Sequence, residues 1–188
     1  YVAASFYGEP AKKLRMVGIT GTKGKTTTTY LVKSILEKAG YKVGLIGTIE
    51  AIIGEKHIPA NNTTPESFVL QQYFKEMEEA GCQVVVMEVA SQGLKLHRTQ
   101  GFTFELGIFT NLEPDHIGPN EHADFEEYQY CKGLLFKQCK VGIVNKDDAH
   151  MEAVLKGHTC QIETYGFDRT ADLYAEDLKL VNKPGELG

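Results

Sequence analysis

The stretch "GITGTKGKTTTTYLV", from Gly18 to Val32, predicts a phosphate-binding loop between a strand and a helix. Residues 16–20, "MVGIT", are typical of a buried strand, and residues 26–40 have a helical period. A tight loop at this place points successive backbone N–H groups at one spot, beside the positive end of the helix. The usual P-loop spacing would require glycine at position 19, where this chain has Ile19.

The predicted loop has the groups needed to hold a nucleotide triphosphate with magnesium. Lys25 is expected to neutralise the β- and γ-phosphates, and the Thr26 hydroxyl is placed to bind the metal. The predicted nucleotide-binding residues are Gly21, Thr22, Lys23, Gly24, Lys25, Thr26 and Thr27. The alternative is a turn rich in Gly and Thr that binds no ligand.

Beyond this loop, the chain alternates short β-rich runs with longer segments of helical period. This pattern predicts an α/β fold with a mostly parallel sheet flanked by helices. Further strands are expected over residues 41–48, 82–91, 104–112, 141–145 and 160–166. Further helices are expected over residues 61–81 and 124–139 and from about residue 148, and a hairpin around Gly54 over residues 49–60.

Several residues have expected local roles within the predicted helices. The apolar stripe of the first helix is predicted to be Tyr30, Leu31, Ile35 and Leu36. Thr64 is suited to cap the helix of residues 61–81, and Asp124 with Glu127 resembles a capping box. Gly133 is unfavourable inside a helix, which indicates close packing there.

The composition excludes several functional classes. The net charge of -5, with no run of Lys or Arg, gives no electrostatic footprint for nucleic acid or an acidic membrane surface. No apolar stretch approaches the ~20 residues needed to span a bilayer. The four cysteines are irregularly spaced, which indicates neither a zinc cluster nor a disulfide framework, and a reducing, cytoplasmic setting is expected.

Polar residues that end predicted strands are candidates for the rest of the site. Ligands of open α/β sheets bind beyond the carboxyl ends of the strands, where Glu88 closes "VVVME" and His116 follows "FELGIFTNL". With Thr26, they form a set of oxygen and imidazole ligands suited to magnesium on phosphates. The alternatives are an exposed strand-end carboxylate and a structural or exposed histidine.

"TGTKGKTTT" resembles the ATP loop of the Mur ligase superfamily and of folylpolyglutamate synthetases, in which Gly-Thr-x-Gly-Lys-Thr replaces the common spacing. The resemblance implies ATP-driven amide ligation. It also implies a role for Lys132, because Mur ligases carry a lysine in this helix, some fifteen residues after the Asp-His pair, that reacts with carbon dioxide. The resulting carbamylated lysine helps to bind magnesium. By residue type alone, Lys132 is a solvated helix lysine.

The segments "IGTIEAIIGEKHIPANNTTPES", "MEVASQGLKLHR", "GIFTNLEPDH" and "VNKDDAH" extend the resemblance over nearly the whole chain. They resemble the branch of the superfamily that adds the third residue of the peptidoglycan stem peptide. That branch phosphorylates a carboxylate of UDP-N-acetylmuramoyl dipeptide, and an amino acid then attacks the acyl phosphate. The residues that the resemblance places on the muramoyl substrate are Asn62, Thr63, Thr64, Ser91 and Arg98. The residue-level alternatives are a helix cap for Thr64 and a surface charge for Arg98.

The chain also departs from the family pattern at two substrate contacts. The family often reads Glu-Val-Ser-Ser-His, with a Gln two residues before the arginine, whereas this chain has Ala90, Gln92 and Leu96 at the differing positions. "DHIGPNEHADFEEY" likewise replaces the more usual Asp-His-Leu-Asp-Tyr-His run. These differences indicate a divergent subgroup.

The resemblance implies a three-domain organisation, of which this chain holds the centre. Residues 1–14 are expected to be a linker from an N-terminal domain, and residues 15–188 an ATP-binding domain that is incomplete at its C-terminal end. A C-terminal domain would select the amino acid, so this chain is expected not to complete ligation by itself. The rival interpretations are a folylpolyglutamate synthetase, disfavoured by "NNTTPES", and a P-loop regulatory module. Residues 145–148, "NKDD", imitate a guanine motif, but the surrounding chain matches the ligases.

Overall fold

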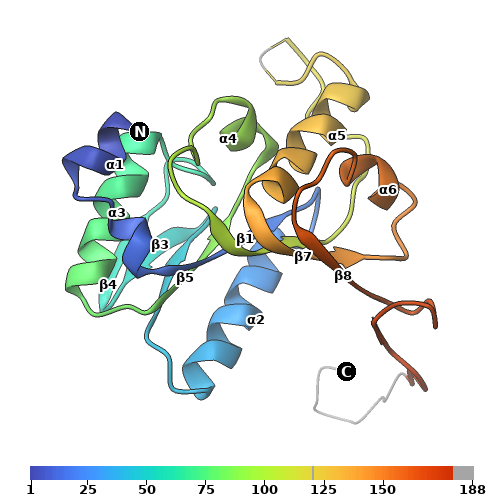
Figure 1. The fold of residues 1–188 in the computed structure, drawn as a ribbon, viewed down its shortest axis with the longest axis horizontal. Coiled ribbons are helices and arrows are strands. Elements are labelled where there is room, and N and C mark those ends of the chain that lie inside the picture. The colour runs from blue at the N-terminus through green and yellow to red at the C-terminus, as the bar shows by residue number, and fades with distance from the viewer. Residues whose placement is uncertain (120, 180–188) are drawn as a thin grey trace.

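The computed structural model describes residues 1–119 and 121–179 as a sheet with helices on both faces (Figure 1). The strands are β1 (Arg15–Thr20), β2 (Val43–Ile46), β3 (Glu50–Ile53), β4 (Lys56–Pro59), β5 (Val84–Glu88), β6 (Phe104–Phe109), β7 (Cys139–Asn145), β8 (Gln161–Gly166) and β9 (Leu173–Tyr174). The helices are α1 (Val2–Phe6), α2 (Lys25–Lys38), α3 (Ser67–Glu79), α4 (Ser91–Lys95), α5 (Phe125–Gly133) and α6 (Met151–Val154), with 3-10 helices η1 (Pro10–Lys13) and η2 (Leu134–Lys137). None of these helices is long and apolar enough to cross a membrane. The predicted α/β class is confirmed.

The sheet has the order β4-β3-β2-β5-β1-β6-β7-β8-β9. Strands β2, β5, β1, β6, β7, β8 and β9 pair in parallel, whereas β3 and β4 form the antiparallel hairpin predicted around Gly54. β1 lies between β5 and β6, and it is buried along almost its whole length. The phosphate-loop candidate therefore begins at the centre of the sheet.

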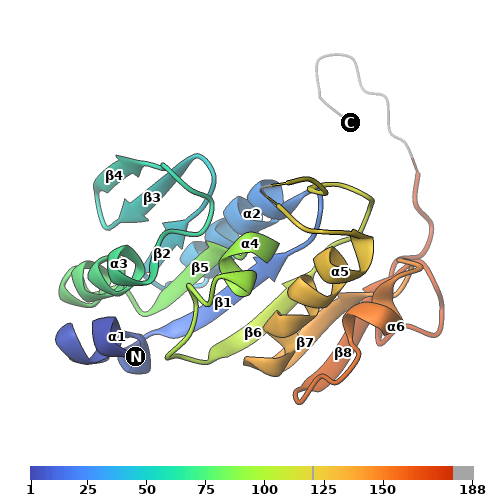
Figure 2. The same ribbon diagram turned by 90° about the horizontal axis from the view of Figure 1, so that it is seen from above.

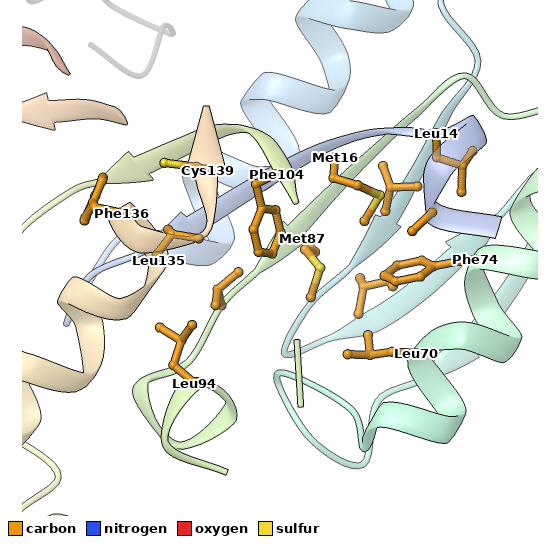
Figure 3. Packing of buried hydrophobic residues seen from close by; sticks show 14 of the residues in the cluster. Leu14, Met16, Leu70, Phe74, Met87, Leu94, Phe104, Leu135, Phe136 and Cys139 are labelled. Atoms are coloured by element: carbon orange, nitrogen blue, oxygen red, sulfur yellow. The ribbon is translucent and has the colours of Figure 1, made fainter. Parts of the chain in front are cut away.

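The larger hydrophobic core lies on the sheet face that α3, α4 and α5 cover (Figures 1 and 3). Leu70 and Phe74 of α3 and Leu94 of α4 point toward the strands, where they meet side chains such as Met87 and Phe104. Burial of aliphatic and aromatic side chains is the main stabilising contribution of such a face. This packing fixes the position of the helices relative to the strand ends.

The opposite face carries α2, and its apolar stripe differs from the prediction. Val32 and Leu36 pack against a second core cluster, whereas 58% of Leu31 and 66% of Ile35 remain exposed. Thr29, which is fully buried, continues the inward stripe at helical spacing. The prediction is therefore wrong for Leu31 and Ile35, because the buried side of α2 is turned by about one residue from the predicted side.

Three local predictions have different outcomes. Thr64 does not cap α3, because Glu66 is the N-cap and the Thr64 side chain bonds elsewhere. Asp124 does cap α5, since its Oδ1 accepts from the backbone N–H of Glu127 at 2.7 Å. A Cβ on Gly133 would lie 2.4 Å from the Val154 carbonyl oxygen, which confirms close packing at this glycine.

Residues 1–14, predicted as a linker, contain α1 and η1. Both lie against α3, which gives this segment a defined place beside the sheet (Figure 2). The boundary predicted at residue 15 coincides with the start of β1. Of the predicted domain over residues 15–188, residues 120 and 180–188 lie outside the described part.

The carboxyl ends of the parallel strands form the edge on which the candidate residues lie. β1 is followed by the glycine loop, β2 by Gly47 and Thr48, and β5 ends at Glu88. The loop after β6 runs beside the loop after β1 (Figure 2), and Asn111 accepts a backbone hydrogen bond from Thr22. Residues from four strand ends are thus brought to one site.

Candidate active site

The glycine loop has a backbone shape that requires glycine at two positions. Gly21 has φ 151°, and a Cβ there would lie 1.9 Å from the Thr110 hydroxyl oxygen. Gly24 has φ 81° and is the N-cap of α2. Asn111 also clamps Lys23, accepting from its N–H at 2.9 Å and donating to its carbonyl at 3.0 Å. Asn111, which lies just after β6, therefore fixes the loop backbone next to the N-terminus of α2. A fixed loop at a helix N-terminus is the arrangement that phosphate-binding sites use.

Lys25 folds back over this loop. Its ammonium donates to the carbonyl oxygens of Gly21 at 2.9 Å and Thr22 at 3.0 Å. Burial lowers the pKa of Lys25, and the negative charges of Glu88 and Asp115 partly offset that effect. The cation is thus held beside the N–H groups that an anionic ligand would contact.

Glu88 receives hydrogen bonds from the first turn of α2 and from Thr48, which follows β2. The Thr26 hydroxyl donates to Glu88 Oε2 at 3.0 Å. Thr48 donates its N–H to Oε1 at 2.9 Å and its hydroxyl to Oε2 at 3.0 Å. Glu88 is only 1% exposed, so the alternative of a carboxylate that reaches solvent is wrong. The predicted Thr26–Glu88 pair is present.

Lys132 lies beneath the loop and is not a solvated helix lysine. It is 1% exposed, and its Nζ donates to the Gly21 carbonyl at 2.7 Å. The same nitrogen lies 4.4 Å from the centre of the Tyr128 ring. Burial, reinforced by the positive charge of Lys25, lowers the pKa of Lys132 well below its usual value. A buried amine of this kind has a larger neutral fraction than a surface lysine.

His116 lies at the rim of the site. Its side chain is 48% exposed, and Nδ1 lies 3.0 Å from Glu121 Oε1, while Nε2 lies 3.9 Å from Asp115 Oδ2. Among the hydrogen bonds and ion pairs of residues 1–119 and 121–179, none joins His116 to Thr26 or Glu88. The structure therefore brings together Thr26 and Glu88 of the predicted metal set, and leaves His116 outside their hydrogen-bonded group.

The predicted substrate residues come from two segments, one before Glu88 in the sequence and one after it. Asn62 is exposed, and the Thr63 hydroxyl lies 3.1 Å from that of Thr48. Thr64 is buried, and its hydroxyl donates to the Glu88 carbonyl and accepts from the Ala90 N–H. Of the first two, only Thr63 is linked to the Glu88 group.

Arg98 and Ser91 are held by other protein groups. Arg98 donates to the Thr64 carbonyl at 3.0 Å and pairs with Glu66 at 2.5 Å, with its side chain 15% exposed. It is therefore not a free surface charge. Ser91 is buried, and its hydroxyl lies 2.9 Å from Nε2 of the fully buried His122.

The donor groups around Glu88 fit magnesium better than they fit a metal that is bound by protein side chains alone. The residues at positions 1–119 and 121–179 contain no group of three His, Cys, Asp or Glu side chains that could hold a metal ion. The Thr26 hydroxyl and the Glu88 carboxylate meet beside the glycine loop, and the Thr48 hydroxyl donates to the same carboxylate oxygen. Magnesium commonly takes one or two such protein oxygens and completes its shell with phosphate and water.

Sequence reasoning missed three residues that shape this site. Thr48 follows β2, and the rule about polar residues after strands that selected Glu88 would have selected it too. Asn111 follows β6 and was within reach of the same rule. Tyr128 gave no such signal, because an aromatic residue on α5 is typical of a core; its hydroxyl donates to the Thr22 hydroxyl at 3.1 Å.

The chain matches a known family and known relatives. Residues 19–187 match the family described as the Mur ligase middle domain. A relative from Clostridium acetobutylicum, named UDP-N-acetylmuramoyl-L-alanyl-D-glutamate--2,6-diaminopimelate ligase 1, is 49% identical over 185 residues, or 98% of this chain. The chain spans 38% of that relative's length.

Solved structures share the fold. One named as a UDP-N-acetylmuramoyl-L-alanyl-D-glutamate--2,6-diaminopimelate ligase has a TM-score of 0.79 and 30% identity, over 87% of this chain and 34% of its own. A structure titled as an FPGS-AMPPCP-folate complex has a TM-score of 0.70 over 96% of this chain and 51% of its own. Its identity is 18%, so it shows likeness of fold alone.

Proposed function

Because the chain belongs to the Mur ligase middle-domain family, we propose that it carries the nucleotide site of an ATP-dependent amide ligase of peptidoglycan precursor synthesis. The observation that carries this proposal is the hydrogen bond from Thr26, next to the glycine loop, to the Glu88 carboxylate. The loop offers N–H groups and Lys25 for phosphates, and the Thr26–Glu88 pair lies directly beside them. A family match over residues 19–187 disfavours the regulatory P-loop module.

In this proposal, the loop binds the triphosphate of ATP. The N–H groups of residues 22–27 and the N-terminus of α2 surround the phosphates, and Lys25 turns from the Gly21 and Thr22 carbonyls toward the β- and γ-phosphates. Phosphoryl transfer of this kind depends on positioning and charge neutralisation. No serine or cysteine nucleophile is required from the protein.

Thr26 and Glu88 would hold magnesium, with His116 and Lys132 as further candidates. The ion supplies positive charge that neutralises the phosphate oxygens during transfer. His116 would have to leave Glu121 to join Glu88. Lys132 requires conversion to a carbamate, and its lowered pKa supports this chemistry, since only the neutral amine attacks carbon dioxide.

The acceptor is proposed to be UDP-N-acetylmuramoyl-L-alanyl-D-glutamate, which the names of the relatives contain. Asn62 and Thr63 are accessible and lie on the Glu88 side of the site. Arg98 would present its guanidinium to an anionic part of the substrate only after rearranging its contact with Glu66. Thr64 and Ser91 are buried, so we propose that they support the substrate-binding residues and do not contact the substrate themselves.

The reaction proposed is transfer of the γ-phosphate to a substrate carboxylate, followed by attack of an amine on the acyl phosphate with release of phosphate. The incoming amine is proposed to come from 2,6-diaminopimelate, the amino acid in the names of the relatives. The groups that would select this amino acid are proposed to lie in the part of the relatives' length that this chain does not span. A folylpolyglutamate synthetase remains the alternative ligase to be tested.

The test uses the full-length ligase of which this chain is proposed to be the middle domain. Phosphate release from ATP is measured with UDP-N-acetylmuramoyl-L-alanyl-D-glutamate and either 2,6-diaminopimelate or lysine, and product is identified by mass. We expect phosphate and tripeptide to form together with diaminopimelate. Stimulation by folate and glutamate, with no response to the muramoyl dipeptide, would contradict the proposal.

A further inference from the structure

Thr48 lies between the nucleotide loop and the segment proposed to bind the acceptor. It follows β2, and it contacts Glu88 through both its N–H and its hydroxyl. On its other side, its hydroxyl lies 3.1 Å from that of Thr63. The residue therefore links the Glu88 carboxylate to the Thr63 hydroxyl, whereas the neighbouring Thr64 hydroxyl bonds to the Glu88 backbone carbonyl.

The direction of these hydrogen bonds is fixed by Glu88. A threonine hydroxyl has one hydrogen to donate, and a carboxylate only accepts. The Thr48 hydroxyl gives its hydrogen to Glu88 Oε2, so it must accept from Thr63. The hydrogen-bond chain therefore runs from Thr63 through Thr48 to Glu88.

The position of the Glu88 carboxylate in these hydrogen bonds is tightly constrained. A Cβ on Gly47 would lie 2.5 Å from Glu88 Oε1, so the carboxylate occupies the space beside the Thr48 backbone. Oε2 accepts from both Thr26 and Thr48. A ligand that binds Oε2 or Thr26 therefore changes the hydrogen bonding of the oxygen that accepts from Thr48.

We propose that Thr48 is a positioning residue that couples the nucleotide site to Thr63 and orients the Thr63 hydroxyl as a hydrogen-bond acceptor for the second substrate. This rests on the proposed function. With its hydrogen committed to Thr48, Thr63 has only oxygen lone pairs to offer. It would then select an N–H or O–H group of the acceptor substrate, such as an amide or a sugar hydroxyl, and would disfavour a carboxylate at that point.

The first experiment follows Thr63 in the 188-residue chain. Threonine methyl groups are labelled with carbon-13, the Thr63 signal is assigned with Thr63→Val, and magnesium with AMPPCP is added to saturation. We expect the Thr63 signal to shift in the parent chain and to stay in place in Thr48→Val, which keeps the shape but loses the hydroxyl. Thr103→Val, an exposed substitution away from the site, is the control and should leave the shift intact.

The second experiment measures kinetics in the full-length ligase. Losing one hydroxyl–carboxylate hydrogen bond corresponds to about a tenfold or larger effect. We expect Thr48→Val to raise the KM for the muramoyl dipeptide by about tenfold, with a smaller change in kcat, and Thr48→Ser to restore it. A purely packing role predicts the reverse order, because Val keeps the side-chain volume and Ser does not.

The outcomes separate the two proposals. If the parent chain fails to bind magnesium with AMPPCP, the proposed function fails and this inference fails with it. If nucleotide binds but the Thr63 signal moves equally in the parent and in Thr48→Val, the coupling role alone is overturned. A Thr48→Ser enzyme with the same KM defect as Thr48→Val would also overturn it.

Discussion

The Gly21 carbonyl oxygen accepts hydrogen bonds from two lysine ammonium groups, Lys132 at 2.7 Å and Lys25 at 2.9 Å. Lys132 is buried, so the two positive charges are poorly screened from each other. The electrostatic cost is smallest if Lys132 loses its proton or its charge by reaction. The loop proposed to bind nucleotide thus lies over an amine whose pKa is lowered, which favours its neutral form.

The first prediction concerns the chemistry of Lys132. Its neutral fraction should react with carbon dioxide, which converts the buried cation into a carboxylate-bearing group. When the chain is equilibrated with carbon-13 bicarbonate, we expect one carbamate carbon signal in the NMR spectrum. Lys132→Arg should lack it, and Lys95→Arg, which changes a half-buried lysine outside the loop, should keep it. A signal that survives in Lys132→Arg would assign the carbamate to another amine.

The second prediction concerns acid stability and His122. Burial lowers the pKa of His122, and the positive charges of Lys95, Lys132 and His116 add to this effect while Glu127 opposes it. In the window below the unfolded value near 6.5, the unfolded chain binds a proton that the folded chain does not. The free energy of unfolding should therefore rise with pH through this window.

The measurement for His122 is urea denaturation at several pH values between 5 and 7.5, in the parent chain and in His122→Asn. The variant should show a flatter pH dependence, because its side chain does not titrate. The comparison with the variant removes the contributions of the other histidines. Parallel curves for the two proteins would show that His122 is not the group responsible.

The third prediction concerns Gly21. Gly21→Ala places a methyl group where the Thr110 hydroxyl lies and keeps an unfavourable φ, so the free energy of unfolding should fall by about 1–3 kcal/mol. Nucleotide binding should be lost as the loop shifts. Gly81→Ala is the matched control, since Gly81 has φ 78° with no heavy atom within 4 Å of a Cβ. Gly81→Ala should lower the free energy of unfolding by about 1 kcal/mol and leave nucleotide binding intact. Equal binding defects in both variants would contradict the predicted clash at Gly21.

Much of the fold could be predicted because its central strands are short, apolar and flanked by turn residues. β1 was expected over nearly its observed length, whereas the strand expected over residues 82–91 is longer at both ends than β5, which covers Val84–Glu88. α1 and α4 were missed, because five-residue helices do not span two turns and so show no helical period. The stripe of α2 was misplaced because Leu31 and Ile35 are apolar by type, whereas burial depends on the direction in which the helix faces the sheet.

The site was predictable where a backbone rule fixes position. Glu88 and the glycine loop follow from strand ends and loop spacing, and the structure brings them within hydrogen-bond distance through Thr26. Thr64 was misassigned as a cap because side chains that cap helices also bond other backbone groups. Lys132 was reached by resemblance alone, since nothing in "YQYCKGLLF" indicates that α5 passes under Gly21.

The most direct test of the central claim is the affinity of the 188-residue chain for magnesium and AMPPCP, measured by calorimetry in the parent and in Lys25→Ala. The account predicts a weaker affinity in Lys25→Ala by about 10- to 100-fold, because a charge-assisted hydrogen bond to phosphate is lost. Lys42→Ala, which removes an exposed lysine away from the loop, should bind as the parent does. Equal affinity in the parent and Lys25→Ala, or a preference for a guanine nucleotide, would contradict it.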